Sequence, residues 1–530
     1  MIKLTDIRKH AAERPDHVAI VAGTTRLTWA DLEDKVARAA RGLAAELPDT
    51  RPARAVFLAD NSWELIVAMA ACATLGVPCI GLDYTAGPGA TAGALAQLQP
   101  SVILSTGHHR GLLEEADWPG ARTVLHIDLD DSAAQRPARL KPFAELLAHE
   151  PGPVEPVVQP FEAFSFTSGT SGIPKMVIRK TSFEARRLAD LVDQFSFGPD
   201  DTHLVTVPLY HASGPGWARV FLALGGSIVL GRYEDPAELS RIIEAEGVTT
   251  TLMVPPVLTR LVSHPGSENL HRTGKLRFVL SGGRHLNRWV INNAWDRLGP
   301  VLHLYYGTTE SGLNTLITPE ELLVAPCRSG HPMAGNTIVI VDAEGRPLPV
   351  GTRGRVAIAS YQLMDAYANA TPTFLHLDLG DGQGEQRFLL TGDSGVMDEQ
   401  GRLELTGRSD GVAKMDETSP LDVNVFGLES DLMDLPCVRE TSVLRVEVPE
   451  IGDALIVPFA AVSPERLESG RRAVQAACDR RVPCLPNYVV AVDAIPFSPT
   501  GKVRTAQLLD MVLPQVRLVA REQMRELLAV

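Results

Sequence analysis

Short apolar runs alternate with longer amphipathic stretches through the first half of the chain, and each apolar run lies near a turn signal. These runs are residues 53–60, 101–106, 202–209, 226–231 and 249–255. Apolar runs of this kind between helix-like stretches are typical of parallel strands that are buried on both faces. From Leu27 to about Leu280, the pattern therefore predicts an α/β fold.

The pattern changes twice in the second half of the chain. Between about residues 336 and 410, short strands are joined by Gly, Pro and Asp turns, which predicts a β-rich subdomain that closes the large domain. After Asp410 the pattern is mixed again, with strand-like segments, a helical segment at 465–481 and a helical tail at 513–530. The roughly 120 residues after Asp410 are enough for a small α+β domain.

Length, composition and charge narrow the class of protein. A chain of 530 residues with 45% hydrophobic and 22% charged residues is typical of a globular protein with at least two domains. The net charge of -14 would repel nucleic acid and anionic lipid, and no Lys/Arg run offsets it. No segment approaches the ~20 apolar residues of a membrane span. We therefore expect no nucleic-acid or membrane partner and a cytoplasmic location.

The six cysteines form no C-x-x-C pair and have no nearby histidine partners. Their spacing predicts neither a zinc site nor a disulfide framework. We interpret them as reduced and mostly structural.

A Gly-rich stretch at residues 164–180, FSFTSGTSGIPKMVIRK, carries the strongest chemical signal. Glycines let backbone N–H groups turn inward around an anion, hydroxyls add donors, and a lysine supplies a positive charge. The spacing differs from a Walker A loop, which needs GK[S/T] after its second glycine. The stretch predicts a triphosphate-binding loop formed by Thr167, Ser168, Gly169, Thr170, Ser171, Gly172 and Lys175.

This loop resembles the phosphate-loop signature of the ANL superfamily of AMP-forming adenylating enzymes. That superfamily comprises acyl- and aryl-CoA synthetases, adenylation domains of peptide synthetases and luciferases. Segments similar to its other motifs follow in the family's order and cover nearly the whole chain. They are RLTWADL (26–32), ATLGVPCIGLD (73–83), PLYHASGPG (208–216), SGGRHLN (281–287), YYGTTESG (305–312), LLTGDSG (389–395), LTGRSD (405–410) and IPFSPTGKVRTAQL (495–508).

The resemblance implies a large N-terminal domain of α/β subdomains with a distorted β-rich subdomain, residues 1–409. It also implies a small mobile α+β domain, residues 410–530, with a hinge at Asp410. Its cofactors would be ATP and Mg²⁺. Besides the loop, the nucleotide-binding residues would be Gly282, Gly283, Arg284, Tyr306, Gly307, Thr308, Asp393 and Arg408.

Within this set the resemblance suggests particular roles. Tyr306 would stack near the adenine, and Asp393 and Arg408 would bind the ribose hydroxyls, as a carboxylate acceptor and a fork of donors can. Glu310 would hold Mg²⁺, a hard cation that takes oxygen ligands. Thr309 would contact the α-phosphate or the acid.

The resemblance also assigns the reacting acid its surroundings. Lys502 would lie between the acid and the α-phosphate and stabilise the negative charge of the transition state. His211 would separate the acid pocket from the phosphates. Residues expected around the acid are His211, Trp217, Ser281, His285 and Tyr305. The motif at 208–216 has no Asp to pair with an amino group, which favours an acyl or aryl acid over an amino acid.

The segment after the hinge departs from the family's pattern. Thioester-forming members have a glycine-containing loop after a lysine, whereas MDETSPLDV after Lys414 has no glycine and several acidic residues. Acidic residues are a poor lining for a path that serves CoA phosphates. The acceptor therefore stays open between CoA, the thiol of a separate carrier protein and an amine. Two alternatives stay open as well: activation of an unusual acid such as nitrite, and a nucleotide-binding homologue without catalysis.

Overall fold

The computed structural model describes residues 1–47, 53–116, 124–130, 140–167, 175–231, 235–325, 328–380, 382–408, 425–448, 452–482 and 485–528. The chain forms two compact units. Unit 1 comprises Met1–Met253, Arg272–Val279 and Tyr361–Pro372, and unit 2 comprises Val254–His271, Leu280–Ser360 and Thr373–Val530. Asp410 and Lys414 lie outside the described residues, so the hinge and the division into 1–409 and 410–530 stay predictions.

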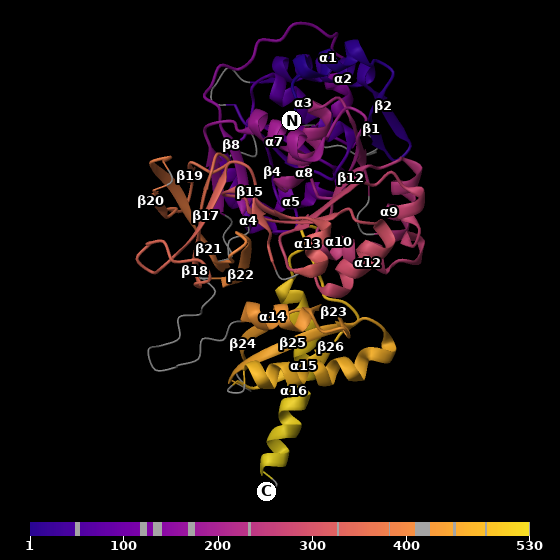
Figure 1. Ribbon diagram of the computed structural model, residues 1–530. Helices are drawn as coiled ribbons and strands as arrows, with labels where there is room; N and C mark the ends of the chain where they lie inside the picture. The colour runs from indigo at the N-terminus through magenta and orange to yellow at the C-terminus, as the bar shows by residue number, and fades with distance from the viewer. Residues whose placement is uncertain are drawn as a thin grey trace. The chain divides into compact units, whose positions relative to one another are not determined.

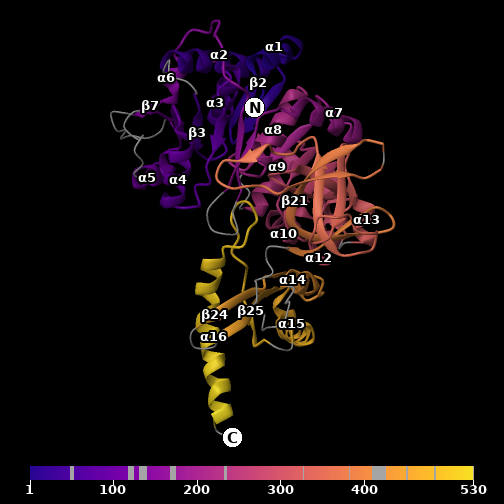
Figure 2. The same ribbon diagram turned by 90° about the vertical axis from the view of Figure 1, so that its left-hand side faces the viewer.

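A parallel sheet in unit 1 has the strand order β4-β3-β5-β6-β7. Apolar side chains of β3 and β5 pack with helix α4 in a buried core, and Ser62 caps the N-terminus of α3 by accepting from the N–H of Leu65. Figure 2 shows α3, α4 and α5 grouped with β3. The elements are β3 (Ala55–Leu58), α3 (Trp63–Thr74), β4 (Cys79–Gly81), α4 (Pro88–Leu98), β5 (Val102–Ser105), η1 (Gly107–His109), α5 (Arg110–Glu115), β6 (Leu125–Asp128), β7 (Leu140–Pro142) and α6 (Phe143–Leu147).

A second group of strands in unit 1 has the order β12-β10-β11-β1-β2. All pairs in it are parallel except β1 with β2. A smaller antiparallel group has the order β19-β9-β8. The elements are α1 (Leu4–Glu13), β1 (Val18–Ala22), β2 (Thr25–Thr28), α2 (Trp29–Glu46), β8 (Ala163–Thr167), β9 (Lys175–Arg179), α7 (Glu184–Phe195), β10 (Thr202–Val205), α8 (Ser213–Ala223), β11 (Ser227–Leu230), α9 (Pro236–Ala245), β12 (Thr250–Leu252) and β19 (Ala366–Tyr367).

The predicted α/β class is confirmed by these strands. The five apolar runs of the first half contain β3, β5, β10, β11 and β12, and each of these strands pairs in parallel with a neighbour. Burial on both faces explains why their sequences lack the alternation of a half-exposed strand.

Unit 2 contains the β-rich region that the sequence predicts after residue 336. Strands β14, β15 and β16 pair antiparallel, and a separate antiparallel sheet has the order β17-β18-β21-β20, with β22 paired to β21. The elements are α10 (Pro255–Ser263), η2 (Pro265–Ser267), α12 (Arg288–Leu298), β14 (Leu302–Thr308), β15 (Gly312–Ile317), α13 (Pro319–Val324), β16 (His331–Pro332), β17 (Asn336–Val341), β18 (Gly354–Ser360), β20 (Phe374–Asp378), β21 (Glu385–Met397) and β22 (Leu403–Arg408). Strand β13 (Phe278–Gly282) ends in unit 2, and α11 (Leu270–Thr273) begins there.

The C-terminal part of unit 2 has a core of its own. Strand β25 is the centre of a sheet with β23 and β24 antiparallel and β26 parallel to it. Leu455, Val457 and Phe459 pack with α14 and α15, whereas Ala454 and Ile456 pack with α16. Alternation along one strand thus places helices on both faces of this sheet (Figure 1). The elements are α14 (Val425–Met433), β23 (Val438–Thr441), β24 (Leu444–Val448), β25 (Gly452–Ala461), η3 (Pro464–Arg466), α15 (Leu467–Arg481), β26 (Asn487–Ala491) and α16 (Thr505–Leu528).

The C-terminal helix is longer than the sequence suggests. We expect a helical tail from residue 513, but α16 begins at Thr505 and includes Pro514. Leu508, Val512 and Val516 recur every four residues and are buried against the sheet, and this packing stabilises the extra turns. Among the described residues, none of the helices combines the length with the hydropathy that a membrane span requires.

Candidate functional site

Three of the predicted nucleotide-binding segments meet in unit 2. The hydroxyl of Tyr306 on β14 donates a hydrogen bond to Asp393 Oδ2 on β21, at 2.6 Å. Asp393 in turn is the register partner of Arg408 on β22, next to a β-bulge in that pair of strands. A carboxylate offers about four lone-pair positions, so Asp393 can accept further hydrogen bonds beside the one from Tyr306.

The backbone around Asp393 is held by a buried threonine. The N–H of Asp393 donates to Thr391 Oγ1 at 3.1 Å, and this hydroxyl donates to Val356 O at 2.9 Å. On the other side, Tyr306 packs with apolar side chains of β17 and β18, including Ile338 and Ile358. These contacts fix the positions of both partners of the Tyr306–Asp393 hydrogen bond.

The turn between β14 and β15 carries Thr309 and Glu310. Gly307 is required in this hairpin, because a Cβ at this position would collide with the backbone oxygen of Gly312. The hydroxyls of Thr308 and Ser311 are 2.9 Å apart, and Ser311 Oγ donates to Asn314 Oδ1 at 2.6 Å. Thr308, a predicted nucleotide contact, therefore has its hydroxyl engaged within the turn.

The chemistry of the side chains on this turn fits Mg²⁺. Glu310 offers carboxylate oxygens and is half-buried, and hydroxyl groups lie in the same turn. Oxygen ligands of this type are those that Mg²⁺ takes in proteins.

The end of β13 lies very close to β14. A Cβ at Gly282 would lie 2.5 Å from the backbone oxygen of Tyr305 and 2.6 Å from its ring. Only glycine allows this approach. Burial raises the pKa of Tyr305 to about 12, so its phenol is neutral at physiological pH. Ser281 Oγ is buried without a hydrogen-bond partner among the described residues, and Gly283 has a φ of +82° with open space around it.

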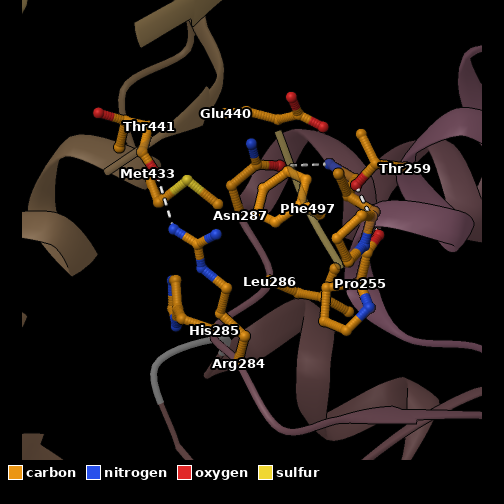
Figure 3. Close-up of a pocket in the computed structure, with 12 residues that line it drawn as sticks. Pro255, Thr259, Arg284, His285, Leu286, Asn287, Met433, Glu440, Thr441 and Phe497 are labelled. Atoms are coloured by element: carbon orange, nitrogen blue, oxygen red, sulfur yellow. Dashed lines mark hydrogen bonds between the residues drawn. The ribbon is translucent and has the colours of Figure 1, made fainter. Parts of the chain in front are cut away.

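Arg284 contacts the C-terminal part of unit 2. Its guanidinium donates to Glu429 Oε1 at 2.5 Å and to Thr441 O at 2.7 Å, and it lies 5.1 Å above the ring of Phe497. Figure 3 shows the Arg284 side chain extended toward Thr441. The sequence prediction assigns Arg284 to the nucleotide, whereas its contacts here are with protein groups.

His285 and Asn287 continue this contact. His285 Nε2 lies 3.6 Å from Asp434 Oδ1. Asn287 donates to Val438 O at 3.2 Å and to Arg439 O at 2.7 Å. These residues line a cavity of about 20 Å³, room for one water rather than a substrate. The cavity is lined by Pro255, Pro256, Thr259, Arg284, His285, Leu286, Asn287, Val290, Met433, Glu440, Thr441 and Phe497.

Lys502 lies in a tight turn before α16. Phe497 and Val503 form a β-bridge, and the N–H of Lys502 donates to Ser498 Oγ at 3.2 Å. Gly501 at φ +80° fits against the start of α10, since a Cβ there would lie 3.1 Å from the Cβ of Val254, the residue before the helix, and 3.3 Å from Cδ of Pro256. The backbone of the Lys502 turn is therefore fixed by its own hydrogen bonds and by α10.

In unit 1, the predicted phosphate loop joins two paired strands. Thr167 at the end of β8 is the register partner of Lys175 at the start of β9, so the two strands hold both ends of the loop together. Lys175 Nζ lies 5.4 Å above the ring of Tyr367. Ser168, Gly169, Thr170, Ser171 and Gly172 lie outside the described residues, and their phosphate contacts stay predictions.

His211 and Trp217 have different surroundings in unit 1. His211 Nδ1 lies 2.8 Å from Ser213 Oγ, in the turn that begins α8. Trp217 is buried in an aromatic cluster with Phe197, Phe221 and Phe278. This packing accounts for the burial of Trp217, and its role in an acid pocket stays a prediction.

Asn61 is a supporting residue that the sequence motifs do not reveal. Its amide donates to Val207 O at 3.1 Å, and its oxygen accepts from Leu209 N at 2.8 Å. It thereby holds the segment that leads to His211. Asn61 and Leu209 are 148 residues apart in the sequence, so no local sequence pattern could reveal their contact.

Comparison with known proteins agrees with the ordered motifs. The family described as AMP-binding enzyme matches residues 7–368. A salicylyl-CoA synthase / salicylate adenylyltransferase from a Streptomyces species is 26% identical over 532 residues, which cover 94% of this chain and 91% of the relative. A feruloyl-CoA synthase from an Amycolatopsis species is 25% identical over 505 residues, which cover 93% of this chain and 96% of the relative.

A solved structure has the same fold. The amide bond synthetase McbA from Marinactinospora thermotolerans aligns with a TM-score of 0.75 and 24% identity, over 96% of this chain and 99% of that chain. The fold and the ordered motifs define an AMP-forming ligase that activates an acid as its adenylate. The chain belongs to the AMP-binding enzyme family, within the ANL superfamily that its motifs resemble.

Proposed function

We propose that the protein activates an aryl carboxylic acid as its acyl-AMP, with release of pyrophosphate, and then transfers the acyl group to a thiol or an amine. The observation that carries the nucleotide half of this proposal is the 2.6 Å hydrogen bond between Tyr306 and Asp393. It joins two motifs that lie 87 residues apart in the sequence, and the register of β21 and β22 adds Arg408 as a neighbour of Asp393.

In the first step, a carboxylate oxygen of the acid forms a bond to the α-phosphorus of ATP. The bond from that phosphorus to the bridging oxygen breaks, and its electron pair leaves with pyrophosphate. No side-chain nucleophile is needed, so the protein contributes alignment and charge stabilisation. Asp393 would accept hydrogen bonds from the ribose, and Lys502 would stabilise the negative charge that develops at the reacting oxygens.

Glu310 would hold the metal ion together with phosphate oxygens. A bound Mg²⁺ would neutralise part of the negative charge on the phosphates. The hydrogen bonds among Thr308, Ser311 and Asn314 fix the turn, so the carboxylate of Glu310 has a rigid support.

Several relatives are named for acids that carry an aromatic ring and others for fatty acids, and the acceptors differ as well. Two relatives are named for salicylyl-CoA and feruloyl-CoA, whose acyl groups both carry an aromatic ring, and these names favour the aromatic class that we propose. A structural neighbour is named an amide bond synthetase, and another relative is named a fatty acid–acyl-carrier-protein ligase. CoA, a carrier-protein thiol and an amine therefore all remain acceptors to be tested.

Mass spectrometry of reaction mixtures tests the proposal. The purified protein is incubated with ATP, Mg²⁺ and a panel of aryl, acyl and inorganic acids that includes nitrite. CoA, amines or a carrier protein is supplied in turn. We expect AMP, pyrophosphate and one aryl-acyl product. AMP formation with acyl acids or nitrite, and not with aryl acids, would contradict the aryl assignment. No AMP with any acid would indicate a homologue without catalysis.

A further inference from the structure

Three side chains with metal-binding atoms meet in unit 1, at the carboxyl end of the parallel sheet β4-β3-β5-β6-β7. Asp60 follows β3, and His108 and His109 follow β5. The chain passes from β3 to β4 on one side and then returns to place β5 on the other side of β3. The loops after β3 and β5 therefore diverge at the point where the strand order reverses, and ligands of open α/β sheets bind in the crevice at such points.

The ligand atoms of these residues converge. His108 Nε2 lies 2.8 Å from Asp60 Oδ2, and His109 Nε2 lies 3.1 Å from Asp60 Oδ1. The three ligand atoms all lie within 4.8 Å of one another. The His109 side chain is 12% exposed and that of His108 is 61% exposed, so the cluster is supported from the protein side and open to solvent.

Aromatic packing holds the His109 ring in place. Tyr84 stacks on it with ring centroids 4.0 Å apart and planes 18° from parallel. The rings of His108 and His109 lie 4.0 Å apart at 45°. The 3₁₀ turn Gly107–His109 sets the backbone of both histidines. The packed His109 ring, with its Nε2 directed at the carboxylate, is preorganised for a ligand, and the more exposed His108 ring lies against it.

We propose that Asp60, His108 and His109 form a binding site for a divalent transition-metal ion of the zinc class. Imidazole nitrogens together with one carboxylate suit Zn²⁺, Co²⁺ or Ni²⁺ better than Mg²⁺ or Ca²⁺, which take oxygen ligands. Tetrahedral zinc with bonds of about 2.05 Å places its ligand atoms about 3.3 Å apart. The two carboxylate–imidazole separations, 2.8 Å to Oδ2 and 3.1 Å to Oδ1, would increase slightly to admit the ion, and the widest separation among the three ligand atoms, which is within 4.8 Å, would decrease.

Three protein ligands leave at least one coordination position for water or a ligand atom, as in open zinc sites.

The charged residues next to the three ligands do not oppose the binding of a cation strongly. Arg110 follows His109 directly, but its guanidinium donates to the buried carboxylate of Asp128 at 2.9 Å. The carboxylate of Asp130 also lies near this turn: its Oδ2 would be 3.5 Å from a Cβ built on Gly107.

The site shares its support with the segment that carries His211. Asn61, the residue after Asp60, bonds to Val207 and Leu209. Tyr84, which stacks on His109, also contacts the ring of Tyr210 edge to face, with centroids 4.8 Å apart. A metal ion bound here would therefore fix the loops that also support the segment Val207–His211.

Direct metal binding tests this proposal without any enzyme assay. The tag-free full-length protein is stripped with a chelator and titrated with Co²⁺ and Zn²⁺. Binding is followed by the visible absorption of Co²⁺ and by calorimetry. We expect one ion per chain, Co²⁺ bands of a four- or five-coordinate site, displacement by Zn²⁺, and a higher Tm with Zn²⁺.

Two ligand variants and one control make the test specific. Asp60→Asn keeps the shape of the side chain, and His108→Ala removes an exposed group, so both should fold. Each should weaken Zn²⁺ binding by about tenfold or more. His331→Ala is the control, because His331 Nε2 lies 3.1 Å from Glu321 Oε1 in a similar pair without a second histidine. Absence of Co²⁺ and Zn²⁺ binding by the natural sequence, or equal binding by Asp60→Asn and His108→Ala, would overturn the proposal.

Discussion

Tyr306 and Asp393 are joined by a hydrogen bond of 2.6 Å in which the phenol donates to the carboxylate. The bond links the motif at 305–312 to the motif at 389–395, and it lies where the proposed function places the nucleotide ribose. Substitution of either partner of this hydrogen bond therefore tests the proposed nucleotide site directly.

Removal of the Tyr306 hydroxyl should weaken ATP use. Tyr306→Phe removes the hydrogen bond that the phenol donates to Asp393, and we expect kcat/KM for ATP to fall by about tenfold. Asp393→Ala, which would remove hydrogen bonds from the ribose to a charged acceptor, should cost about 10- to 100-fold. AMP formation at varied ATP concentration measures both effects.

Tyr361→Phe is the matched control, because its hydroxyl donates to Asp190 at 2.7 Å in a second Tyr–Asp pair. It should leave the ATP kinetics unchanged. The ribose assignment fails if Asp393→Ala is as active as the natural sequence.

Gly282→Ala should destabilise the protein. The new methyl group would lie 2.5 Å from the Tyr305 backbone oxygen, and overpacking of this kind costs about 1–3 kcal/mol. Gly93→Ala in α4 is the control, since a Cβ there meets no atom within 4 Å and alanine favours a helix by up to about 1 kcal/mol. Urea unfolding should give a lower midpoint for Gly282→Ala only. Equal midpoints for the two variants would refute the close contact.

Mutation can distinguish a structural role of Arg284, through its contacts with protein groups, from a role in nucleotide binding. Loss of hydrogen bonds to Glu429 and Thr441 should reduce unfolding free energy by about 1.5–3 kcal/mol in Arg284→Met. In a double-mutant cycle with Glu429→Gln, the two changes should be strongly non-additive. Additive effects, together with a raised KM for ATP, would instead support the nucleotide role that the motif suggests.

Buried histidine makes the stability depend on pH. Burial lowers the pKa of His203 to about 3, and its Nδ1 lies 2.9 Å from Thr250 Oγ1. The unfolded chain takes up a proton near pH 6.5, so the stabilisation is complete above that pH and is lost as the pH falls toward 3. Between pH 7.5 and pH 5, the protonation of this histidine in the unfolded chain should lower the unfolding free energy by about 2 kcal/mol.

Denaturant unfolding at pH 5 and pH 7.5 measures this dependence. His203→Gln cannot take up the proton, so the difference in unfolding free energy between the two pH values should shrink. Part of the slope should remain in His203→Gln, because burial also lowers the pKa of His126 to about 4. An unchanged slope in His203→Gln would contradict the assignment.

Local patterns predict the class of fold and the order of the motifs, because buried parallel strands and Gly-rich turns leave strong signals in sequence. The strands that contain Ala55–Leu58 and Thr202–Val205 are examples. Long-range partners leave no such signal. The contacts of Arg284 with Glu429 and Thr441 join segments about 150 residues apart, and the motif around Arg284 suggests a different partner.

The contact of His108 and His109 with Asp60 is likewise a long-range one that the sequence does not reveal. Spacing predicts no metal site, since Asp60 lies 49 residues before His109 and only the reversal of strand order brings the three ligands together. The extended start of α16 is another tertiary effect, because packing against the sheet outweighs the cost of Pro514.

Acid-dependent exchange of labelled pyrophosphate into ATP tests the central claim most directly. The natural sequence should catalyse exchange only when a suitable aryl acid is present. Lys502→Ala should abolish exchange but still bind ATP, as measured by calorimetry, because the proposed function assigns its ammonium to the transition state rather than to the bound nucleotide. Absence of exchange with every acid tested, or full exchange by Lys502→Ala, would contradict the account.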